Sequence, residues 1–89
     1  MKVVINTNYG GFRLSDEAEG MLEQRGVTVD DILYERSHQA LVEVVELLGP
    51  GANAQGCNLK VVEIPDDVKW HVAEYDGSEW VAENHRTWT

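Results

Sequence analysis

The sequence contains little cysteine, proline or phenylalanine, and its apolar runs are short. The single Cys57 excludes an internal disulfide and a multi-cysteine zinc site. A membrane span needs about 18 apolar residues in a row, and no apolar run in the sequence approaches that length. No signal-peptide pattern precedes Val3. We therefore expect a complete cytoplasmic protein of one domain, residues 1–89, that does not enter a membrane.

Basic residues are also scarce, because seven lysines and arginines face sixteen aspartates and glutamates, for a net charge of −9. Duplex nucleic acid and anionic membranes attract basic surfaces, so neither is expected as a partner. A small anionic ligand is compatible with this charge, because a pocket needs only two or three well-placed cations. A chain of this length buries a thin core, which self-association would extend.

The first quarter of the chain predicts a strand followed by a helix. Residues 2–6, KVVIN, show no alternation of apolar and polar residues, which favours a buried strand. Ser15 is a good helix N-cap because two acids follow it, and Gly26 is typical of a helix end. Gly20 weakens this helix by about 1 kcal/mol relative to alanine.

The next stretch contains one ambiguous segment and one clear helix. Residues 27–36 fit either a short helix capped by Thr28, which is slightly favoured, or an extended connector. Apolar residues at helical spacing predict a helix that starts at Ser37 and is ended by Gly49-Pro50.

The last third of the chain has the pattern of β-strands. Strands are expected at 57–64, 69–75 and 78–83, and Asp76-Gly77 is a strong signal for a two-residue type I′ hairpin turn. The predicted fold is α+β, with a four-stranded mixed sheet and two to three helices on one face. The N-terminal strand and a C-terminal three-stranded meander form this sheet.

A hairpin turn at Asp76-Gly77 fixes which residues face each other. The expected pairs are Tyr75 with Ser78, Ala73 with Trp80, Val72 with Val81 and Trp70 with Glu83. Both faces of this hairpin are then partly apolar, while helices cover only one. An exposed aromatic face is typical of a contact surface, so we expect a homo-oligomer in preference to aromatics lying flat at the rim.

The same register places Glu74 opposite Glu79. Two carboxylates directly opposite each other destabilise a hairpin unless a cation lies between them. The candidates for this cation are Arg13, Arg86 or a lysine of a neighbouring subunit. The alternative is a pair of solvated carboxylates at the hairpin end.

The glycine corner, NTNYGGFRLS, is the first candidate site. Backbone N–H groups at Gly10 and Gly11, followed by a helix start, can bind a phosphate, and Arg13 is the local cation. The corner lacks the Walker pattern, and two acids at the same helix start oppose an anion. From the residues alone, a tight turn that lets Tyr9 and Phe12 pack is the favoured interpretation.

The C-terminal NHRTWT is the second candidate, because it combines an amide, an imidazole, a guanidinium and an indole. Trp88 could stack on a nucleotide base, and Arg86 could grip a phosphate. A tail whose Trp88 packs on the sheet, with His85 and Arg86 in solvent, is an equally good interpretation.

Catalysis and metal binding are not expected. The three histidines are far apart in the sequence and lack metal-ligand spacing, and the acids form no recognisable pair. Asp66 and Asp67 fit a solvated turn better than a metal site. No cofactor is predicted.

Two stretches, VVINTNYGGFRLSDEA and LVEVVELLGPGANAQGCNLKVVEIPDDVKWHVAEYDGSEWVAENHRTW, carry a resemblance. In their order and motifs, GGF-x-LS, EIPDD, EYDG and HR-x-W, they resemble a family of small phage-encoded proteins of unknown function. The resemblance covers most of the chain and is weakest over residues 24–38.

The resemblance implies a phage accessory protein with a role in host takeover or counter-defence, by analogy with sponges that sequester nucleotide immune signals. The expected ligand is then a cyclic ADP-ribose-like signal made by TIR enzymes, bound without turnover. The alternative is an acidic interaction module that docks onto a host protein. The residues assigned to the ligand site are Tyr9, Gly10, Gly11, Phe12, Arg13, Tyr75, Trp80, His85, Arg86 and Trp88.

Overall fold

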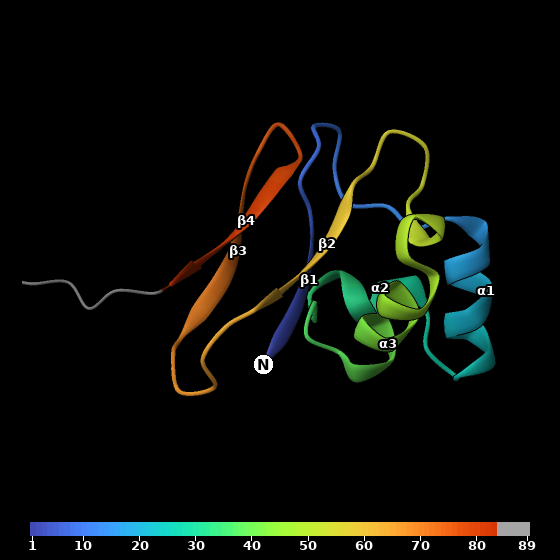
Figure 1. Ribbon diagram of the computed structural model, residues 1–89, viewed down its shortest axis with the longest axis horizontal. Coiled ribbons are helices and arrows are strands. Elements are labelled where there is room, and N and C mark those ends of the chain that lie inside the picture. Colours follow the sequence, from blue (N-terminus) through green and yellow to red (C-terminus); the bar gives the residue numbers. More distant parts are fainter. Residues whose placement is uncertain (84–89) are drawn as a thin grey trace, which may run out of the picture.

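The computed structural model describes residues 1–83, which form an α+β fold (Figure 1). Its elements in chain order are β1 (Lys2–Asn6), α1 (Asp16–Gln24), α2 (Val29–Leu33), α3 (Gln39–Leu48), the 3₁₀ helix η1 (Gly49–Ala52), β2 (Leu59–Glu63), β3 (Trp70–Tyr75) and β4 (Ser78–Glu83). Within these residues, no helix is long and apolar enough to cross a membrane.

The helix signals in the sequence are confirmed. The Ser15 hydroxyl accepts the Ala18 N–H at 3.1 Å, which caps α1, and Gly26 has the positive φ of 75° expected just beyond a helix end. Thr28 and Asp31 form a reciprocal capping box, so the ambiguous segment contains a short helix. The longer helix begins slightly later than predicted, because the side chain of His38 caps it.

Gly20 lies inside α1, and no heavy atom lies within 4 Å of the position that its Cβ would take. We expect Gly20→Ala to raise the free energy of unfolding by about 1 kcal/mol, because alanine has the higher helix propensity and meets no neighbour. Urea denaturation of the two proteins measures this difference. A stability equal to or below that of the parent chain would contradict the assignment of Gly20 to an open helix position.

Asp31 is the acid of the α2 capping box. Hydrogen bonds from Thr28, above all from its backbone N–H at 2.9 Å, lower the pKa of Asp31 from its ordinary value of 3.8. The stability that this carboxylate contributes is therefore present above pH 3.8 and is lost as the pH falls through the folded value. NMR titration should give a lower midpoint for Asp31 in the folded chain than in urea, and equal midpoints would contradict the capping box.

The strands form two antiparallel two-stranded sheets, β1–β2 and β3–β4. The hairpin register is confirmed: Tyr75 pairs with Ser78, Ala73 with Trp80, Val72 with Val81 and Trp70 with Glu83. The prediction of one four-stranded mixed sheet with a three-stranded meander is wrong, because β2 pairs with β1 and not with β3. This pairing continues beyond the strands, where Met1 and Ile64 exchange backbone hydrogen bonds.

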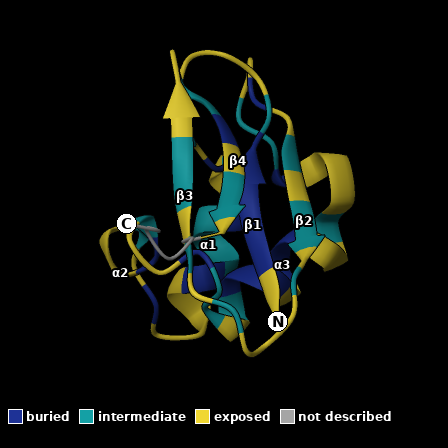
Figure 2. Cartoon of the chain, turned by 90° about the vertical axis from the view of Figure 1, so that its left-hand side faces the viewer, coloured by how far each residue is buried: buried dark blue, intermediate teal, exposed yellow. Residues whose placement is uncertain are grey.

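The edge of β1 that faces the hairpin is occupied by other groups, which explains why the sheet is interrupted. The Val4 N–H donates to the Arg36 carbonyl at 2.9 Å, and the Asn6 N–H donates to a Glu79 carboxylate oxygen at 2.8 Å. Figure 2 shows the strands side by side in the order β3, β4, β1, β2. The hairpin therefore joins β1 through side chains and not through a continuous backbone ladder.

The core lies between β1 and the helices, which gather on one side of the strands (Figure 1). Its buried members are Val4, Leu14, Ala18, Leu22, Val27, Ile32, Leu41, Val42, Val44, Val45 and Ala52. The strand β1 is central to the fold, since its side chains from Val3 to Asn6 are all buried (Figure 2). Apolar burial at about 25 cal/mol per Å² supplies the main driving force for this packing.

Candidate functional site

Three loops meet at one end of the molecule, where Asn6 ends β1 (Figure 1). The Asn6 side chain is fully buried, and its amide nitrogen donates to the carbonyls of Asn8, Gly11 and Gly77 at 2.8 to 3.0 Å. Its amide oxygen accepts the Asn58 N–H at 3.0 Å. One side chain thus ties the glycine corner to the hairpin tip and to the start of β2.

The hairpin tip packs directly on the glycine corner. The Gly10 N–H donates to the Asp76 carbonyl at 2.8 Å, so this backbone donor already has an acceptor. A Cβ on Gly77 would overlap the Gly11 nitrogen and lie 2.6 Å from the Gly10 nitrogen. The corner therefore binds a segment of its own chain in the position where the phosphate-cradle interpretation would place an anion.

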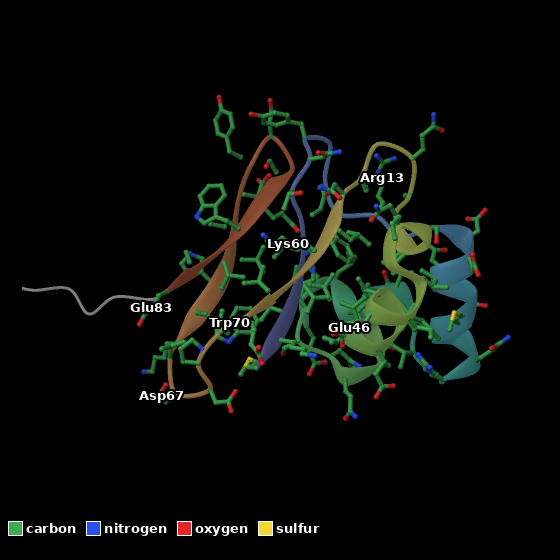
Figure 3. All side chains as sticks on the ribbon, viewed as in Figure 1. Arg13, Glu46, Lys60, Asp67, Trp70 and Glu83 are labelled. Carbon is green, nitrogen blue, oxygen red and sulfur yellow. The ribbon has the colours of Figure 1, made fainter. Side chains whose placement is uncertain are left out.

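Two further predicted site residues flank this corner. The Arg13 side chain is exposed at the same end of the molecule (Figure 3) and donates to the Gln55 carbonyl at 3.0 Å. One of its terminal nitrogens lies 3.9 Å from the position that a Cβ on Gly10 would take. The Phe12 ring turns toward the core, where the Arg36 guanidinium carbon lies 3.8 Å from the ring centroid.

Arg36, in the turn between α2 and α3, and Glu79, on β4, form a buried bidentate ion pair. Their side chains are only 10% and 7% exposed, and the nitrogen–oxygen distances are 2.7 and 2.9 Å. The sequence left two alternatives for the Glu74–Glu79 pair, solvated carboxylates or a nearby cation, with Arg13, Arg86 or a lysine from another subunit as candidates. The cation is Arg36, which lies in the segment 27–36 where the secondary structure was ambiguous. Glu74 accepts the Gly77 N–H at 2.8 Å.

The hairpin has an outer face, which by strand alternation carries His71, Ala73, Tyr75, Trp80 and Ala82. Tyr75 is 70% exposed and Trp80 is 49% exposed, and they are diagonal neighbours on this face. Tyr9, at 68% exposure, precedes the glycine that bonds the hairpin tip. Three predicted site residues therefore present aromatic rings to solvent on or beside the hairpin.

The inner face of the hairpin borders a cavity of about 460 Å³ beside the end of α2. Its lining residues are Leu33, Tyr34, Arg36, Trp70, His71, Val72, Glu74 and Glu79. We call this space the α2–hairpin cleft. The sequence pattern did not indicate this cleft, and the one related sequence signal was the Glu74–Glu79 pair of the predicted hairpin register.

The remaining predicted site residues, His85, Arg86 and Trp88, lie outside the described residues. The described chain ends at Glu83, which pairs with Trp70 at the opposite end of the hairpin from the tip (Figure 3). Because β4 has six residues, Glu83 lies about 17 Å along the strand from Ser78, the first residue after the hairpin tip that packs on the glycine corner. Any contact between the glycine corner and the C-terminal segment has to bridge this separation or involve a second subunit.

Among residues 1–83, no group of three or more His, Cys, Asp or Glu side chains is placed to hold a metal ion. Cys57 is buried at the start of the segment that leads into β2, where its thiol donates to the Gly11 carbonyl at 3.3 Å. Comparison of the chain with protein-family models, with curated proteins and with solved structures finds no match.

Proposed function

We propose that this protein is a non-catalytic binding module, which docks the outer face of its β3–β4 hairpin onto a basic segment of another protein. The exposed pair Tyr75 and Trp80 on one face carries this proposal. Tyrosine and tryptophan are enriched among the residues that dominate binding energy at protein interfaces. An exposed patch of such residues is typical of an interaction surface.

The charge of the chain indicates the kind of partner. Residues 70–83 contain no lysine or arginine, and their glutamates, Glu74, Glu79 and Glu83, lie on the opposite face of the hairpin from Tyr75 and Trp80. The argument for a basic partner is therefore the surface charge of the whole chain, which has a net charge of −9. Such a surface steers basic partners toward it and repels acidic ones. In the phage setting that the resemblance implies, the partner is a host protein in the cytoplasm.

Alanine substitution of Tyr75 and of Trp80 tests this function. Each change should lower the affinity for a partner captured from bacterial lysate by about 30-fold or more, as expected for interface residues worth at least about 2 kcal/mol. Leu47→Ala is the matched control, because Leu47 is also exposed but lies on α3. Equal capture by all three variants would refute the proposal. A shift from oligomer to monomer in Trp80→Ala would identify a second copy of the chain as the partner.

Sequestration of a cyclic ADP-ribose-like nucleotide without turnover is the second candidate function. It is supported by the position of two exposed rings, Tyr9 and Tyr75, next to the residues that form the Gly10–Asp76 hydrogen bond, with Arg13 nearby. It ranks second because the Gly10 N–H already has an acceptor and the hairpin is acidic. Calorimetry against cyclic and linear adenine nucleotides tests it. No heat with any of them, and no nucleotide released on heating, would exclude it.

A further inference from the structure

We propose that the α2–hairpin cleft accepts an arginine or lysine side chain of a protein partner. This inference goes beyond the proposed function, because the cleft lies on the other face of the hairpin from Tyr75 and Trp80. It names the chemical group that a basic partner would insert there. The cavity, at about 460 Å³, is within the range of about 300–1,000 Å³ that is usual for ligand sites.

Two carboxylates line the cleft, together with one arginine and His71. Glu74 and Glu79 face each other across β3 and β4, and both line the cavity. Arg36 neutralises Glu79 through the bidentate pair, and Glu74 bonds a neutral backbone N–H. A second cation in the cleft would pair with Glu74, the carboxylate that Arg36 does not neutralise.

Aromatic rings add to the attraction for a cation. Tyr34, at the end of α2, is 97% exposed, and the half-buried Trp70 lines the other side of the cleft. The faces of aromatic rings attract ammonium and guanidinium groups. A flexible basic side chain can therefore reach both a ring and a carboxylate in this cleft.

The resident arginine does not make the cleft a site for anions. The Arg36 Nε donates to the Leu33 carbonyl at 2.9 Å, and both terminal nitrogens donate to Glu79. The face of its guanidinium packs on Phe12. The Arg36 guanidinium thus already pairs with groups of its own chain. A phosphate that entered the cleft would be repelled by the Glu74 carboxylate.

NMR titration of the full chain with a hexa-arginine peptide tests the inference. We expect a saturable shift of the Trp70 indole N–H that hexaglutamate does not produce. Tyr34→Ala and Glu74→Gln should each weaken peptide binding about fivefold. Glutamine keeps an oxygen that can accept the Gly77 N–H, and the Tyr34 side chain is almost fully exposed, so both variants should fold.

Glu23→Gln is the matched control, since it removes the same charge from an exposed position on α1. Equal weakening by Glu23→Gln and Glu74→Gln would show general attraction to an acidic surface and overturn the inference. A Trp70 indole signal that does not move on addition of hexa-arginine would also overturn the inference. If the Trp80 signal shifts instead, the proposed function remains supported. Conversely, a shift at Trp70 with partner capture unaffected by Trp80→Ala would refute the proposed function and support the cleft.

Discussion

Replacing Arg36 with methionine is expected to lower the free energy of unfolding by about 3–5 kcal/mol, since it leaves the Glu79 carboxylate buried without its partner. The pair is almost inaccessible to solvent, so water cannot replace the lost interaction. The substitution also removes the guanidinium that packs on the Phe12 ring. Urea denaturation monitored by circular dichroism measures the loss.

The double substitution Arg36→Met with Glu79→Gln is the informative companion. It removes both charges but keeps an oxygen to accept the Asn6 N–H. We expect it to recover most of the lost stability, because a buried neutral pair lacks the cost of an unpaired charge. A loss below about 1 kcal/mol for Arg36→Met, or no recovery in the double variant, would contradict the structural role given to this ion pair.

Gly77→Ala is expected to separate the hairpin tip from the glycine corner and to cost about 3 kcal/mol or more. Its Cβ would overlap the Gly11 backbone, which cannot move aside as a flexible side chain does. Gly77 also has a φ of 87°, in the region that alanine rarely adopts. Denaturation gives the cost, and loss of amide protection at Gly10 would report the separation directly.

Gly11→Ala separates these two effects. Gly11 has a φ of 98°, but a Cβ there has no heavy atom within 4 Å. It should therefore show only the backbone strain, about 1–2 kcal/mol. Similar losses in the two variants would mean that the overlap at Gly77 is relieved by a small movement of the hairpin.

Local signals in the sequence predicted the local structure well. Asp76-Gly77 sets the hairpin register because a two-residue turn permits only one pairing, and Asp76 adopts the required positive φ of 54°. Ser15 and Thr28 marked helix starts because a capping side chain bonds an N–H two or three residues away. These features depend on neighbours in the chain, so the sequence alone contains the necessary information.

Contacts between distant residues were not predictable in the same way. Nothing in the pattern of residues 57–64 distinguishes pairing with β1 from pairing with β3, since both alternatives bury the same side chains. Arg36 is the single basic residue in the ambiguous segment 27–36, and only the tertiary fold brings it within 2.7 Å of Glu79. The α2–hairpin cleft depends on that same long-range contact, so no local pattern in the sequence indicates its position.

The interruption between β1 and β4 has a consequence for the dynamics of the protein. The hairpin β3–β4 forms from contacts between residues close in sequence. It is attached to β1 and the helices by the Arg36–Glu79 ion pair, by Asn6 and by the loop contacts at its tip. Such an arrangement favours two cooperative units, one of which can open while the other remains folded. Amide hydrogen exchange should then be faster in residues 70–83 than in residues 2–6. A partner that bridges the two units would slow exchange in both, so local opening and binding would be thermodynamically linked.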